Sequence, residues 1–164
     1  METLYEGGSG YISLSKKHPE KMPLKFEAGT LNYLGIAGLY GSLKFLESKG
    51  LKKIYDSEMK LTQYLLENFS QREHIKIYGT QKIEFKVPLI SFNLKSLYPS
   101  EVSYILDKKY SIYVRGGIQC APLIHKTINT IPHGTTRVSF GPNNSIEEVD
   151  SLIQAIKEII SQVN

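Results

Sequence analysis

One short stretch of the chain holds a cation, two glycines and the only thiol: residues 115–122, with Arg115, Gly116, Gly117 and Cys120. The nucleophilic form of cysteine is the thiolate, and a nearby guanidinium favours that form. The two glycines adopt backbone angles that other residues avoid, so the thiol can lie on a loop that bends. The pattern predicts a nucleophilic Cys120. Free cysteine is also among the most buried residue types, and on this segment alone a small core residue remains an equal alternative.

Length and charge narrow the class of protein. The chain has 164 residues, which is enough for one domain with a core. Its net charge of +4 is too small to indicate a nucleic-acid-binding surface. Its lysines are scattered, as on solvated faces. A single cysteine excludes a disulfide framework and a Cys-rich zinc site. We expect a cytoplasmic protein with no metal site, no nucleic-acid partner and no membrane contact, because there is no membrane-length apolar run and no signal-peptide pattern at the start.

The first half of the chain predicts a loop followed by two helices. Residues 1–28 are rich in Gly, Ser, Lys and Pro and have little to bury. A helix is expected to begin at Thr30 or Asn32, either of which can cap it, and to end before Gly50. Glycines at three positions leave one face of this helix without bulk, at a cost of roughly 1 kcal/mol each, which indicates a close neighbour. A second helix is expected over residues 51–69.

The second half mixes strands with helices. Strands are expected over residues 75–78, 83–85, 89–94, 111–114 and 135–140. Helices are expected over residues 99–110, 121–129 and from a capping box at Ser145 onward. The alternation around Arg137 sets its side chain opposite Val138 and Phe140, and so away from the core. Without a regular strand-helix-strand alternation, the fold class is α+β, with helices packed on one face of a mainly antiparallel sheet.

Three separated segments now stand out: 26–30 (Phe-Glu-Ala-Gly-Thr), 115–122, and 137–144 ahead of the last helix. In order and spacing they resemble the C-terminal part of the cysteine desulfurases and selenocysteine lyases. These are pyridoxal-phosphate enzymes of fold type I in the class V aminotransferase family. The resemblance implies that residues 29–164 form the small C-terminal domain, and that residues 1–28 form a loop that packs on a large domain absent from this chain.

The resemblance also assigns roles to site residues. Cys120 matches the nucleophile that takes sulfur or selenium from the substrate, and Arg137 matches the arginine that binds the substrate's α-carboxylate. Arg115 takes a supporting place near substrate or thiolate. Gly29 and Thr30 match a pair that contacts the cofactor phosphate across a dimer interface. Read without the family, Arg137 is an ordinary strand arginine and Thr30 an ordinary helix cap.

Two neighbours of the thiol depart from the family pattern. The family often has threonine or serine where Gly116 stands, and histidine where Gln119 stands. Neither change removes the nucleophile, but both bear on the geometry of the loop. His125, five residues beyond Cys120, is expected to be a structural histidine rather than a group that tunes the thiol.

The resemblance implies removal of sulfur from L-cysteine or selenium from selenocysteine by a homodimer, with alanine and a Cys120 persulfide as products and a sulfur-acceptor protein as a further partner. The cofactor is pyridoxal phosphate, held through a Schiff-base lysine. No lysine here stands in a matching context, so we expect the chain alone to be inactive. The alternative is a stand-alone, non-catalytic domain of the same fold that carries sulfur, regulates or assists assembly.

We predict that this polypeptide alone does not bind pyridoxal phosphate covalently. Incubation with the cofactor, borohydride reduction and intact-mass measurement should leave the mass of the chain unchanged, because a specific adduct requires a lysine beside a preformed cofactor pocket. Reduction onto one defined lysine in high yield would contradict the expectation, whereas low-level labelling spread over many lysines would not.

Overall fold

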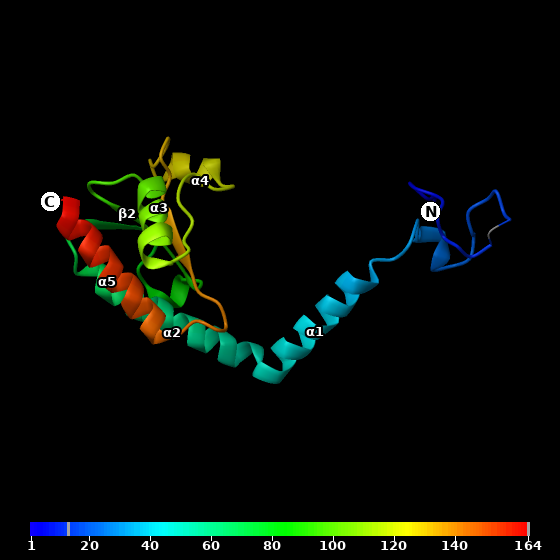
Figure 1. Cartoon of the computed structure of the whole chain (residues 1–164), viewed down its shortest axis with the longest axis horizontal. Helices are drawn as coiled ribbons and strands as arrows, with labels where there is room; N and C mark the ends of the chain where they lie inside the picture. The colour runs from blue at the N-terminus through cyan, green and yellow to red at the C-terminus, as the bar shows by residue number, and fades with distance from the viewer. Residues whose placement is uncertain (13, 164) are drawn as a thin grey trace. The chain divides into compact units, whose positions relative to one another are not determined.

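The computed structural model describes residues 1–12 and 14–163, which divide into two compact units, Met1–Lys49 and Gly50–Asn164 (Figure 1). Each unit is described by itself. The boundary predicted from the sequence, between a loop over residues 1–28 and a small domain over residues 29–164, concerns the whole enzyme and stays a prediction. None of the helices in the described part of the chain is both long and apolar enough to cross a membrane.

The first unit contains a short 3-10 helix, η1 (Leu24–Phe26), and one long helix, α1 (Tyr33–Lys49). Asn32 is the residue that caps α1, because its side-chain oxygen accepts a hydrogen bond from the backbone N–H of Gly35 at 3.0 Å. Thr30, the other candidate, lies ahead of the helix. Apolar residues such as Leu39 and Leu43 are exposed along α1, which buries none of its residues in the described structure.

The sheet of the second unit is an antiparallel meander. Its strands are β1 (Ile75–Tyr78), β2 (Leu89–Leu94) and β3 (Thr136–Ser139), in the order β1-β2-β3. Ser91 in the middle strand lies opposite Tyr78 on one side and opposite Arg137 on the other. Because side chains alternate between the two faces of a strand, this register fixes which residues share a face.

One face of the sheet is the core face, covered by α2 (Leu51–Ser70), α3 (Pro99–Tyr110) and α5 (Ile146–Val163). Figure 1 shows α5 running alongside α2. The apolar spacing of these helices directs their buried positions inward. Phe69 of α2 meets Phe92 of β2 edge to face, with ring centroids 4.9 Å apart. The largest fully buried apolar side chains include Phe69, Phe92, Leu65, Ile90, Leu106 and Ile156.

One half of the capping box predicted at Ser145 is present at the start of α5, the hydrogen bond to the Glu148 side chain. The backbone N–H of Ser145 donates to Glu148 at 3.0 Å, and the side-chain amide of Asn144 donates to the same carboxylate at 2.9 Å. These two hydrogen bonds, that of Asn144 first, hold the pKa of Glu148 below its ordinary value. A lowered folded-state pKa stabilises the fold above the ordinary pKa of glutamate, and the contribution is lost as the pH falls below it.

Two predicted strands are absent from the described structure. Residues 83–85 form a 3-10 helix, η2 (Ile83–Phe85), in which Phe85 donates to Lys82 and Lys86 to Ile83. Between Gly79 and Pro88 the chain satisfies these backbone groups locally instead of joining the sheet.

Residues 111–114 are also not a strand, because α3 ends in a compact cap there. Ser111 adopts a left-handed conformation (φ 55°), and the N–H of Ile112 reaches back to the carbonyl of Leu106 at 3.0 Å. Ile112 and Val114 pack against the core as a strand pattern would suggest, but pairing with β3 begins only at Arg115. The short helix expected over 121–129 is α4 (Pro122–Thr127). The α+β prediction is confirmed.

We predict that the core in the second unit carries the stability of that unit. Leu65→Ala should lower the free energy of unfolding by about 2–5 kcal/mol, because the side chain is fully buried and its removal leaves a cavity. The matched change Leu43→Ala, on the exposed surface of α1, should change it by less than about 0.5 kcal/mol. Urea denaturation followed by circular dichroism measures both, and equal losses would contradict this assignment of the core.

Candidate functional site

The site begins with a pairing between the segment after α3 and the third strand. Arg115 and Arg137 lie directly opposite each other and exchange both backbone hydrogen bonds, at 3.1 and 2.8 Å. Two residues along, Gly117 and Thr135 also exchange both bonds, each at 3.1 Å. Residues 115–117 therefore extend the sheet by a short fourth segment beside β3.

This pairing brings the two predicted arginines together on one face. Directly opposite residues of an antiparallel pair project to the same side of the sheet. The β2–β3 register adds Ser91 to the same row, and the β1–β2 register adds Tyr78. The row lies on the face opposite the core, because its neighbours Ile90 and Val138 are buried.

The electrostatics of the row favour an anion. Arg137 is half-buried, and its Nε is a buried donor with no hydrogen-bond partner. In the described part of the chain, none of the ion pairs involves Arg115 or Arg137. Two arginine side chains on one face, with no carboxylate paired to either in the described residues, suit a ligand that carries a carboxylate, since arginine offers a planar fork of donors.

The glycines next to Arg115 are closely packed. A side chain on Gly116 would collide with the carbonyl oxygen of Pro99 and lie 2.7 Å from the hydroxyl oxygen of Ser103, both in α3. Gly117 has a φ of +103°, and a side chain on Gly134 would collide with the backbone of Gly117. Glycine at these positions therefore lets α3, the loop and the start of β3 approach each other.

Cys120 lies on a turn that leaves this packed region. The N–H of Ala121 approaches the carbonyl of Ile118 at 3.4 Å, and Gln119 inside the turn has a left-handed φ of 60°. The Cys120 side chain is exposed. A small buried core residue, the alternative left open by the sequence, is therefore wrong for this thiol.

Asn93 in β2 is a site residue that the sequence analysis missed. Its Nδ2 donates to the carbonyl of Gly134 at 3.1 Å, and its Oδ1 accepts from the N–H of Thr136 at 3.3 Å. Asn93 thereby ties the start of β3 to β2 and fixes the register of Arg137. The sequence pattern that could have identified Asn93 is the alternation in this strand, where the polar Ser91 and Asn93 are spaced between buried apolar residues.

The histidine beyond Cys120 has a structural role, as predicted. His125 in α4 is 4% exposed, and its Nδ1 lies 2.8 Å from the hydroxyl oxygen of Thr130. The backbone N–H of Thr130 returns to the carbonyl of His125 at 2.9 Å, so the pair closes the end of α4. In the described residues, no three His, Cys, Asp or Glu side chains gather as a metal site would require.

Gly29 and Thr30 belong to the first unit, in a turn before α1 rather than at its first residue. Gly29 has a φ of +79°, no atom occupies the space where its side chain would be, and its N–H donates to the carbonyl of Gly7 at 2.8 Å. Thr30 is exposed. Helix α1 begins at Tyr33, three residues after Thr30, so the positive end of its dipole lies beyond this pair.

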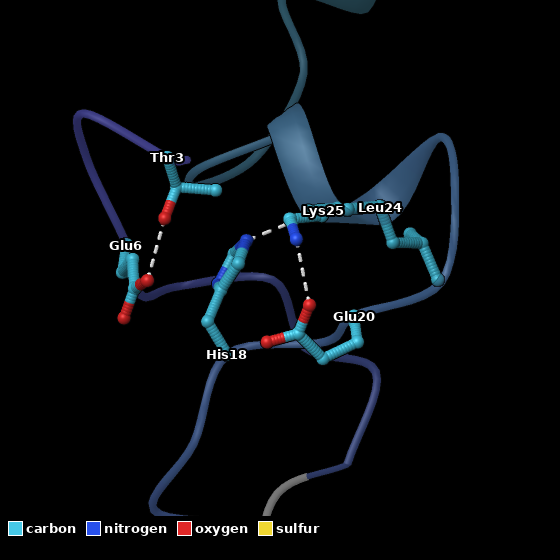
Figure 2. Close-up of polar contacts among 6 residues, drawn as sticks. All are labelled: Thr3, Glu6, His18, Glu20, Leu24 and Lys25. Carbon is cyan, nitrogen blue, oxygen red and sulfur yellow. Dashed lines mark hydrogen bonds and ion pairs between the residues drawn. The ribbon is translucent and has the colours of Figure 1, made fainter. Parts of the chain in front are cut away.

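His18 links the glycine loop of this unit to η1. Its Nδ1 accepts from the N–H of Gly7 at 3.2 Å, which leaves Nε2 as the donor to the carbonyl of Leu24 at 3.1 Å. Figure 2 shows the neighbouring ion pair of Glu20 with Lys25, at 2.7 Å. The hydrogen bond and charge of Lys25 lower the pKa of Glu20.

Comparisons with known proteins show which family this chain resembles. The family model for aminotransferase class V matches residues 1–152. A probable cysteine desulfurase of Staphylococcus aureus (strain COL) is 37% identical over 160 residues, which are 96% of this chain and 38% of the relative. A probable cysteine desulfurase of Pyrococcus abyssi is 35% identical over 141 residues, 86% of this chain and 34% of the relative.

Solved structures give the same result. The apo structure of a cysteine desulfurase from Thermococcus onnurineus NA1 matches with a TM-score of 0.83 and 34% identity, over 97% of this chain and 39% of that protein. The cysteine desulfurase CsdA of Escherichia coli matches with a TM-score of 0.81 at 22% identity, over 99% of this chain and 39% of that protein, which speaks for the fold alone. The chain belongs to the aminotransferase class V family. Its fold matches that of cysteine desulfurases, so the predicted resemblance and fold class are confirmed.

We predict that Gly116 is needed for close packing. Gly116→Ala should lower the free energy of unfolding by about 1–3 kcal/mol, because the added methyl group meets the backbone of α3. Gly38→Ala, where no atom lies within 4 Å of the new carbon, should instead be neutral or stabilise α1 by up to about 1 kcal/mol. Urea denaturation compares the two variants, and a Gly116→Ala protein as stable as the parent would contradict the packing argument.

Proposed function

We propose that this chain is the part of a cysteine desulfurase-like enzyme that binds the substrate carboxylate and accepts its sulfur, giving alanine and a persulfide on Cys120. The observation that carries the proposal is the position of an exposed Cys120 on a turn that extends directly from the Arg115–Arg137 pair. The similarity to cysteine desulfurases supports the reaction class. The chain spans about 38% of the length of the Staphylococcus aureus relative, so the whole activity is proposed for the whole enzyme.

Each residue has a proposed task in this reaction. Arg137 binds the α-carboxylate of L-cysteine or selenocysteine through its guanidinium fork, and Arg115 adds a second positive charge beside it. The Cys120 thiolate attacks the sulfur of the substrate. The carbon–sulfur bond breaks, its electron pair stays on the carbon, and that carbon takes a proton to become the methyl group of alanine. The sulfur remains on Cys120 as the outer atom of the persulfide.

Pyridoxal phosphate, when bound, supplies the electron sink that this cleavage needs. The residues present fit a contact with its phosphate: Thr30 is exposed, and the space in front of Gly29 is open. The N–H of Gly29 is already bonded to Gly7, so the hydroxyl and N–H of Thr30 are the donors we assign to the phosphate. We assign the Schiff-base lysine to the remaining part of the enzyme.

The same proposal includes the setting of the enzyme. We infer a cytoplasmic homodimer in which Gly29 and Thr30 reach the cofactor of the partner subunit. A sulfur-acceptor protein removes the persulfide sulfur from Cys120, as a supply for iron–sulfur cluster assembly requires. The exposure of Cys120 supports such a transfer, because a buried persulfide could not be attacked by a thiol of another protein.

The test is a chimera in which this chain replaces the matching 160 residues of the Staphylococcus aureus relative. With L-cysteine and pyridoxal phosphate, the chimera should release alanine and form a persulfide detectable by mass on the Cys120 peptide. Cys120→Ser should abolish the persulfide. Arg137→Gln should raise KM for cysteine by about tenfold or more, because it removes a charge-assisted pair with the carboxylate.

A chimera that folds, dimerises and binds the cofactor but releases no alanine would contradict the enzymatic proposal. It would leave the non-catalytic sulfur carrier as the second candidate, which the exposed thiol also supports. In that case the 164-residue chain should accept a single sulfur atom on Cys120 from a polysulfide and pass it to a small thiol.

A further inference from the structure

We infer that Gln119 is a positioning residue, which holds the Cys120 turn against the Arg115–Arg137 pair. The inference rests on the proposed role of Cys120 and adds a residue to it. The structure gives Gln119 a backbone conformation that residues other than glycine seldom adopt, with φ at 60°. Such a conformation persists where surrounding contacts hold it, and the side chain of Gln119 supplies those contacts.

The side-chain amide of Gln119 bonds to both strands of the short pairing. Its Nε2 lies 3.4 Å from the carbonyl oxygen of Arg115 and 3.4 Å from that of Thr135. Each carbonyl already accepts one ladder hydrogen bond, from Arg137 and Gly117 respectively, and has a second lone pair free. The amide therefore connects the turn to the residues that flank the guanidinium pair on both strands.

A primary amide can make this pair of contacts from one atom, and an imidazole cannot. The Nε2 of glutamine carries two hydrogens, whereas each ring nitrogen of histidine carries at most one. The glutamine found here in place of histidine is thus a specific alternative way to fasten the turn. It fixes the thiol within electrostatic reach of Arg115 and Arg137, so that the nucleophile and the carboxylate-binding groups keep one mutual geometry.

The test uses two alkylating reagents of similar size on the 164-residue chain. Iodoacetate carries a carboxylate and iodoacetamide does not, so the ratio of their rates at Cys120 reports the positive charge near the thiol. We expect Gln119→Gly to lower this ratio by about threefold at low salt, because the freed turn moves the thiol away from two cations. Glycine accepts the positive φ, so the variant removes the amide without adding backbone strain.

Controls separate positioning from general stability. Gln119→Met keeps the length of the side chain without its donors and should lower the ratio as Gln119→Gly does. Gln154→Ala removes an exposed glutamine amide from α5, where it bonds to Glu158, and should leave the ratio unchanged. A purely structural effect would change both alkylation rates together and would leave their ratio the same.

The outcomes distinguish this inference from the proposed function. If Arg137→Gln lowers the ratio and both Gln119 variants leave it unchanged, Gln119 does not position the thiol, and the inference is wrong while the proposed roles stand. If Arg137→Gln also leaves the ratio unchanged, the thiol lies beyond the influence of that guanidinium, which overturns the inference and the proposed geometry together. If the Gln119 variants and Arg137→Gln all lower the ratio of the two alkylation rates, the result supports both the positioning role of Gln119 and the proposed geometry.

Discussion

The candidate site depends on four backbone hydrogen bonds between residues 115–117 and 135–137. They join a segment that leaves α3 to the last strand of the sheet, although the two are some twenty positions apart in the sequence. Without them Arg115 would belong to a loop, Arg137 to an edge strand, and Cys120 to a turn with no fixed neighbour. Backbone pairing of this kind does not depend on the side chains of the paired residues, so it brings Arg115 and Arg137 together whatever ligand they bind.

The two faces of the sheet carry different kinds of side chain. Its core face contains the apolar residues of all three strands and is covered by α2, α3 and α5. Its other face presents the row of Tyr78, Ser91, Arg137 and Arg115. Alternate residues of each strand face either the core or this row. A substitution on the core face can therefore change stability with little effect on the side chains of the row.

Much of this arrangement was predictable from the sequence, and the exceptions have physical causes. Alternation around Arg137 gave the correct face, and the thiol-bearing segment was recognisable from Arg115 and Cys120 alone. The sequence could not reveal that Arg115 lies opposite Arg137, because register depends on where the cap of α3 ends and pairing starts. The sequence also could not show that Gly116 is closely packed. A glycine that is needed for its backbone conformation and one that is needed for its small size look the same in a sequence.

The pairing of Arg115 with Arg137 has an electrostatic consequence. Like charges directly opposite each other on a sheet repel and destabilise it, and here the backbone bonds keep them in place. An anion that sits between them removes this repulsion as well as forming its own bonds. The affinity for such an anion would therefore include relief of this repulsion, a gain that two separated arginines could not provide.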